Sequence, residues 1–353
     1  MNERRINLCL IAKCIIVATL LFTGDIRGDK SIGKEKPILT YAILGKELWI
    51  LNADGKANIY DLDSLKQLRV YQLVESSIRW IEKETDSTLL IADRENKIIR
   101  LSVYENRSDF LFNYDDGIVY RIISNSLGKI FLITDKGIFD PEQKKHLEPI
   151  FSINSTFAEY NNWQEPSAIY LDKSDNIWIG FDRGEWGGEL FIFNSRKKGY
   201  KVPILKSFQE LNDPVRSFFE INDSIYITYG LNHLGAKGQI VKVTDYKAQI
   251  VFESKYDEGE YIGPGTFNSF DQSIYYYSNL GIFKGEINSD LTARRNWRLF
   301  FQPKMKWQFG QSNAVGYQMN VKDLKFIRKD TLLIFAPQIG LGIYRGNKLH
   351  FLN

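Results

Sequence analysis

The chain has few of the residues from which metal centres and disulfide scaffolds are built. Of its 353 residues, 2 are cysteine and 3 are histidine. Both cysteines, Cys9 and Cys14, precede residue 31, so a domain formed by the rest must be held by its core and strand ladders. His146, His233 and His350 stand far apart, and none has the spacing of metal ligands. We therefore predict neither a metal site nor a disulfide framework.

An excess of charge of one sign is also missing. The chain has 46 Lys and Arg against 43 Asp and Glu, and without residues 1–30 the numbers are 41 and 40. Nucleic acid requires a basic stripe, which this sequence lacks, so we expect no nucleic-acid partner. P-loop, dinucleotide and serine-elbow motifs are absent as well, and no cofactor is predicted.

Long apolar runs are confined to the N-terminal segment, where Arg4 and Arg5 precede an apolar run over residues 8–22 that Lys13 interrupts. The uninterrupted part is shorter than the roughly 20 residues that span a bilayer and fits the core of a signal peptide. We predict a signal peptide over residues 1–30, export to the periplasm, cell surface or medium, and one domain over residues 31–353. Because residues 23–25 lack a clear cleavage pattern, a membrane anchor over residues 8–23 is the alternative.

Aromatic residues, glycine and Asn/Asp turn pairs are abundant, and no long amphipathic helix pattern follows residue 40, which favours an all-β protein. Residues 167–194 show the repeating unit most clearly, as three short strands joined by two turns. In the second strand Ile177 and Ile179 are expected to point one way and Trp178 the other. Gly180 is expected to leave space where neighbouring sheets crowd together.

Weaker copies of this unit recur along the chain at spacings of 41, 41, 47, 48, 49 and 58 residues. Their second strands are centred on Trp49, Leu90, Phe131, Trp178, Tyr226, Tyr275 and Leu333. Periods in the forties with four short strands per unit are typical of β-propellers. We predict seven four-stranded antiparallel blades, with six as the alternative. No strand is left over to join the first blade to the last, so closure should depend on packing between whole blades.

The stretch from Leu171 to Gly180, LDKSDNIWIG, followed by GGELF at residues 187–191, resembles the two-component-regulator type of propeller repeat. Propellers of that family often form the extracytoplasmic sensing part of signalling receptors. The resemblance therefore implies the propeller fold and an exported role in sensing a ligand or binding a partner. It implies nothing about signal output.

The candidate binding residues lie in long connections on one face of the predicted propeller. That face should carry the connections between strands two and three and those between blades. The long connections are residues 154–166, 182–188, 230–238, 256–265 and 303–319. Aromatic and arginine side chains concentrate at binding surfaces, so we predict a site formed by Trp163, Arg183, Trp186 and Trp307. Alternatively, the tryptophans pack these loops onto the blades.

Three functions fit this pattern. The favoured one is an exported propeller that binds a protein or a glycan without catalysis. An enzyme, a lyase or glycoside hydrolase, would use His233 with Glu165 or Glu185 as acid and base. A membrane-anchored assembly scaffold would use residues 8–23 as its anchor.

Overall fold

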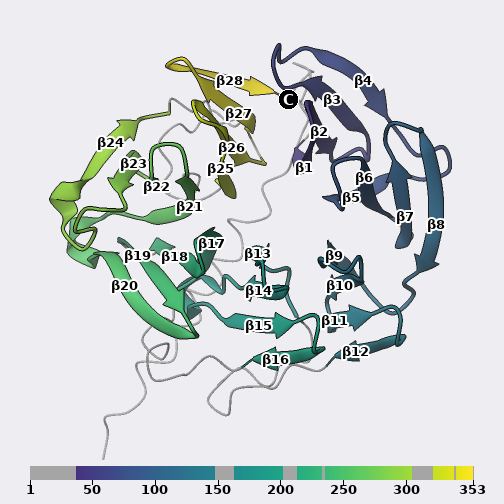
Figure 1. Cartoon of the computed structure of the whole chain (residues 1–353), viewed down its shortest axis with the longest axis horizontal. Helices are drawn as coiled ribbons and strands as arrows, with labels where there is room; N and C mark the ends of the chain where they lie inside the picture. Colours follow the sequence, from purple (N-terminus) through teal and green to yellow (C-terminus); the bar gives the residue numbers. More distant parts are fainter. Residues whose placement is uncertain are drawn as a thin grey trace, which may run out of the picture. The chain divides into compact units, whose positions relative to one another are not determined.

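The computed structural model describes residues 37–147, 163–201, 213–232, 235–303, 321–337 and 339–352. Within these ranges the chain forms seven four-stranded antiparallel sheets, each built from consecutive strands, and no α-helix. The sheets are arranged as blades of a ring, with the first strand of each blade innermost (Figure 1). The predicted seven-bladed propeller is thus confirmed, and the six-bladed alternative is wrong.

The strands follow the sequence blade by blade. Blades 1 to 3 comprise β1 (Ile38–Leu44), β2 (Glu47–Asn52), β3 (Ala57–Asp61), β4 (Gln67–Tyr71), β5 (Ile78–Lys83), β6 (Thr88–Asp93), β7 (Lys97–Ser102), β8 (Arg107–Asn113), β9 (Val119–Ser124), β10 (Ile130–Thr134), β11 (Gly137–Asp140) and β12 (Lys145–Leu147). Blades 4 and 5 comprise β13 (Ala168–Leu171), β14 (Asn176–Gly180), β15 (Leu190–Asn194), β16 (Gly199–Lys201), β17 (Val215–Ile221), β18 (Ser224–Asn232), β19 (Ala236–Thr244) and β20 (Lys247–Ser254). Blades 6 and 7 comprise β21 (Ile262–Asn268), β22 (Ser273–Ser278), β23 (Gly281–Glu286), β24 (Trp297–Phe301), β25 (Asp323–Arg328), β26 (Thr331–Ala336), β27 (Gly340–Arg345) and β28 (Lys348–Leu352).

The Asp-to-Trp motif of blade 4 is structural. Asp172 directly follows the first strand, and its Oδ1 accepts hydrogen bonds from the backbone N–H groups of Ser174 and Asn176, both at 2.8 Å, which closes the turn. Its Oδ2 accepts the indole Nε1–H of Trp178 at 2.8 Å. Trp178 is 3% exposed, so this bond satisfies a buried donor that water cannot reach.

The core is divided into seven apolar clusters, one between each pair of adjacent blades. Strand alternation produces this division, because the two faces of each blade pack against different neighbours. Ile177 and Ile179 face blade 3, whereas Trp178 faces blade 5, as predicted. A Cβ on Gly180 would lie 2.3 Å from Cγ1 of Val215 in blade 5, which confirms that this glycine makes room between sheets.

The ring closes by packing between blade 1 and blade 7, as predicted. One cluster combines Leu48 and Ile50 of β2 with Leu333 of β26 and Ile343 of β27. The Ile38 backbone N–H donates to a carbonyl of blade 7 at 3.1 Å, but every strand of these two blades pairs within its own sheet. Figure 1 shows β28 beside the first blade.

Two predicted loops were wrong. The connection expected over residues 230–238 is mostly strand, because β18 and β19 stay paired as far as Asn232 and Ala236. The connection expected over residues 256–265 ends where β21 begins at Ile262. The glycines that suggested loops serve close packing instead, since a Cβ on Gly230 would lie 2.0 Å from the carbonyl oxygen of Ile262.

The outer strand of blade 3 was also misplaced. It was expected over residues 147–153, but β12 covers Lys145–Leu147, and residues 148–153 lie outside the described ranges. The other outer strands follow the prediction to within a few residues, except that residues 202–205, predicted in blade 4, lie outside the described ranges.

Candidate functional site at the upper mouth of the ring

The connections between blades and those between second and third strands lie on one face of the ring, which we call the upper face. Each innermost strand begins there and runs towards the opposite, lower face. These strands carry several charged residues among apolar ones, namely Glu82 on β5, Arg121 on β9, Arg216 on β17, and Asp323 and Lys325 on β25. Lys322 directly precedes β25. The innermost strands converge at the axis, so side chains far apart in sequence come together.

Arg121 joins blades 2 and 3 to the connection that leads into blade 4. Its Nη1 donates to Glu165 Oε1 at 2.9 Å and to the carbonyl of Tyr120 at 2.7 Å. The guanidinium carbon lies 3.7 Å from the centroid of the Trp80 ring, an arrangement that favours cation–π attraction. Burial lowers the pKa of Arg121, but an arginine remains charged at neutral pH.

Arg216 makes a similar set of contacts in blade 5. It is 7% exposed, its Nε donates to the Gly230 carbonyl at 2.9 Å, and its Nη1 pairs with the carboxylate of Asp182. Its guanidinium also lies 5.4 Å from the centroid of the Tyr261 ring. Asp182 opens the insertion at residues 182–187, so this buried pair fixes the base of the insertion to the neighbouring blade.

Lys322 and Lys325 are the exposed cations of the site. Neither makes an ion pair within the part of the chain that the structure describes. Although the Lys322 residue is exposed, the surrounding blades partly desolvate its ammonium group, which lowers its pKa. The nearby guanidinium groups of Arg216 and Arg121 lower this pKa further, while Asp182 and Glu165 oppose the shift. These mutual effects place the groups from blades 3, 5 and 7 within one electrostatic environment.

Glu82 is the group that titrates near neutral pH. Burial raises its pKa to about 7, and the Trp80 hydrogen bond and the charges of Arg121 and Lys325 limit the rise. The Trp80 Nε1 donates to Glu82 Oε2 at 3.4 Å. On blade 1 the Tyr41 hydroxyl donates to Asp323, and burial, then this carboxylate, raise the Tyr41 pKa.

The charges of the site nearly balance. Its four cations, Arg121, Arg216, Lys322 and Lys325, face four carboxylates, Glu82, Glu165, Asp182 and Asp323, so the small positive remainder near pH 7 comes from the partial protonation of Glu82. Glu165 and Asp182 are held by arginines, and Asp323 accepts the Tyr41 hydroxyl and the Leu324 N–H. Glu82 is partly protonated near pH 7. The two lysines form no ion pair with the described residues, although Lys325 acts electrostatically on Glu82, and Asp182 and Glu165 act on Lys322.

The predicted binding residues have different surroundings. Trp163 packs its connection onto blade 4, with its ring centroid 5.3 Å from Phe191 in a stacked arrangement and 5.3 Å from Phe181 edge-on. Arg183 pairs with Glu189 at 2.6 Å. Trp186, in the short 3₁₀-helix η1 (Gly184–Trp186), is 71% exposed.

The residues predicted for the alternative enzyme site also have different surroundings. Glu165 is engaged by Arg121, and Glu185 is exposed beside Trp186 on η1. Trp307 and His233 lie outside the described residues. Our sequence interpretation missed Arg121, Arg216, Glu82 and Lys325, although a charged residue among alternating apolar ones is a signal that the sequence contains.

Two further observations concern the described residues alone. They contain no group of three or more His, Cys, Asp or Glu side chains arranged to hold a metal ion. They also contain no helix with the length and apolar character needed to cross a membrane, and the predicted anchor at residues 8–23 lies outside them.

Comparison with known proteins supports the fold. No family model and no curated protein sequence matches the chain. Among solved structures, YCF48 from Cyanidioschyzon merolae has a TM-score of 0.59 at 10% identity and is matched over 89% of this chain and 97% of its own. The β-propeller domain of Cps50 (Swd1) from Myceliophteria thermophila has a TM-score of 0.57 at 12% identity, over 94% and 100% of the two chains.

A third similar structure is an extracellular domain. It belongs to BT4673 of B. thetaiotaomicron, a protein assigned as a hybrid two component system, with a TM-score of 0.53 at 12% identity. The match covers 91% of this chain and 40% of that one. At such identities these similarities show the fold alone, which is shared by proteins of different function.

Proposed function

We propose that the chain is an interaction module whose upper face binds an acidic segment of a protein or an acidic glycan. The observation that carries the proposal is the meeting of charged groups from several blades at the mouth of the ring, where Lys322 and Lys325 are exposed and form no direct ion pair with the described residues. A carboxylate placed there would pair with the two ammonium groups and would be partly screened from solvent by the surrounding blades.

The insertion at residues 182–187 is further evidence that the upper face binds a partner. Its base is fixed by the Arg216–Asp182 and Arg183–Glu189 pairs, while Trp186 stays 71% exposed. An exposed tryptophan on an insertion whose base is fixed offers a large contact area to a partner.

Binding of two anionic probes, polyglutamate and oligogalacturonate, to the immobilised domain tests this proposal. We expect binding that weakens steeply with salt and falls at least tenfold in the double variant Lys322→Glu/Lys325→Glu, because charge reversal repels the ligand. Lys348→Glu, an exposed lysine on β28, is the matched control and should bind normally. Equal binding by the double variant and the wild type would contradict the proposal, and the probe that binds identifies the ligand class.

Trp186 has its own test. Trp186→Ala should weaken binding of the same probe several-fold, whereas Phe270→Ala, which removes a 65% exposed ring from a lower-face turn, should not. If both variants bind like the wild type, the insertion has no part in the site.

We also propose that the protein is exported, with residues 1–30 as a signal peptide. The Arg4–Arg5 pair and the apolar run after it support this, and the extracellular neighbour shares the fold. Sequencing the N-terminus of the protein from cell fractions tests it. A mature end near Asp25 is the expected result, whereas an intact Met1 in the membrane fraction would favour the anchored scaffold.

A further inference from the structure

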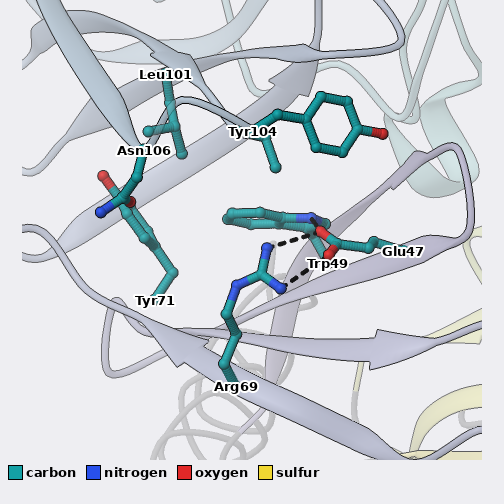
Figure 2. A pocket seen from close by; sticks show the side chains of 8 residues that line it. Glu47, Trp49, Arg69, Tyr71, Leu101, Tyr104 and Asn106 are labelled. Carbon is teal, nitrogen blue, oxygen red and sulfur yellow. Dashed lines mark hydrogen bonds and ion pairs between the residues drawn. The ribbon is translucent and has the colours of Figure 1, made fainter.

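A second pocket, of about 400 Å³, lies between blades 1 and 2 (Figure 2). Blade 1 lines it with residues from β2 and β4, and blade 2 with the end of β7 and the turn that follows. The lining residues are Glu47, Trp49, Arg69, Tyr71, Leu101, Val103, Tyr104 and Asn106. A Cβ on Gly45, in the first turn of blade 1, would lie 3.3 Å from the Tyr104 hydroxyl, so the pocket borders the lower face. It is therefore separate from the charged mouth.

The charges inside this pocket are mutually satisfied. Arg69 donates from Nη1 to Glu47 Oε1 at 2.8 Å and from Nη2 to Oε2 at 3.0 Å, which is a bidentate pair. The Trp49 indole donates to the same Oε2 at 3.0 Å. Figure 2 shows the indole amid the lining residues with this pair along one edge. An ionic ligand would have to disrupt the pair, whereas a neutral ligand would leave it intact.

Aromatic rings supply the apolar surface. Trp49 is 1% exposed, and the Arg69 guanidinium carbon lies over its ring at 5.8 Å from the centroid. Trp49 and the buried Leu101 therefore form the floor, while the accessible rings are those of Tyr71 and Tyr104. The Tyr71 ring lies 5.6 Å from the indole at a 54° tilt, and Tyr104 is 71% exposed at the rim. Tyr104 joins none of the apolar clusters of the described core, so its ring is available to a ligand.

Polar groups stand next to these rings. The Arg69 side chain is 47% exposed and that of Glu47 is 18% exposed, so their outer edges can still exchange hydrogen bonds. The exposed Asn106 amide makes no hydrogen bond to the described residues around it. A neutral sugar presents C–H groups on the faces of its ring and hydroxyl groups around its edge. Aromatic rings can pack against those faces, and hydrogen-bond donors and acceptors can bind those hydroxyl groups.

We infer that this pocket binds a neutral pyranose unit of a glycan. The sugar ring packs against Tyr104 and Tyr71, and its hydroxyl groups bind the Glu47–Arg69 pair and Asn106. A volume of about 400 Å³ is in the range of small-ligand pockets.

Calorimetric titration of the whole domain with maltohexaose, cellohexaose, mannohexaose and xylohexaose tests the inference, with trigalacturonic acid as the anionic comparison. We expect saturable binding of at least one neutral oligosaccharide, with Tyr104→Ala raising its Kd about tenfold because stacking is lost. Arg69→Met should raise the Kd as well, and thermal unfolding will show whether that variant remains folded.

Two control variants make the result specific. Phe110→Ala removes a 62% exposed ring from the outer strand of blade 2, and Lys322→Glu alters the upper mouth, so both should leave the Kd unchanged. The inference is overturned if no neutral oligosaccharide binds, if trigalacturonic acid alone binds, or if Tyr104→Ala binds as tightly as the wild type.

Discussion

At the scale of single residues, chemically identical side chains have different surroundings in the structure. Trp163 and Trp186 both occupy long connections and were equally good candidates by sequence. In the structure Trp163 stacks on Phe191 and secures its connection, whereas Trp186 projects from η1 into solvent. The interpretation that loop tryptophans pack the loops fits Trp163, and the binding interpretation stays open for Trp186.

Glu82 gives a prediction at this scale. Its pKa is about 7 in the folded protein against an ordinary value of 4.5, so its ionisation disfavours the folded state. Stability should therefore fall as pH rises from about 4.5 to 7, by up to about 3 kcal/mol. Glu82→Gln should remove this loss. Urea unfolding of both proteins at pH 5 and pH 8 measures it, and an equal pH dependence in the two would refute the assignment.

At the scale of elements, glycine has two structural roles in this chain, and the sequence alone does not distinguish them. Gly187 has φ of 93° and permits the turn that ends the insertion. Gly180, Gly230 and Gly238 lie in strands, where a Cβ would collide with the adjacent blade. We predicted close packing at Gly180 but loops at Gly230 and Gly238, because a glycine pair flanking a polar stretch is also typical of a loop.

Gly180→Ala tests the packing of blades 4 and 5. The added methyl group would lie 2.3 Å from Val215 Cγ1, so the blades must separate or the valine must shift, at a cost of about 1–3 kcal/mol. Gly199→Ala is the matched control, since its nearest neighbour would be 3.9 Å away. Denaturant unfolding should show a lower midpoint for the first variant and little change for the second. An unchanged midpoint for Gly180→Ala would mean that the blades relax freely.

At the scale of the whole molecule, the junction between blades 1 and 7 determines whether the ring stays closed. Apolar side chains fill this junction, and Asp63 of blade 1 adds one exposed ion pair across it, to Arg328 of blade 7. Exposed pairs contribute little because water and salt screen them. Packing should therefore provide most of the stability.

Ile343→Ala should lower the free energy of unfolding by about 2–5 kcal/mol, because it leaves a cavity between the first and last blades. Asp63→Asn should have only a small effect. Chemical denaturation of both variants compares the two contributions. A larger loss with Asp63→Asn would show that ion pairs, rather than packing, close the ring.

The sequence by itself determined the blades of this protein. Period-two alternation defined the strands, turn residues such as Asp172 separated them, and the repeat spacing gave their number, since all these signals act between neighbours in the chain. The tertiary structure alone decided where the charges meet. Glu82, Arg121, Arg216 and Lys325 belong to different blades, and no local pattern links them. They share one site because a closed ring brings the innermost strands to a common axis, where burial and mutual charge then set their chemistry.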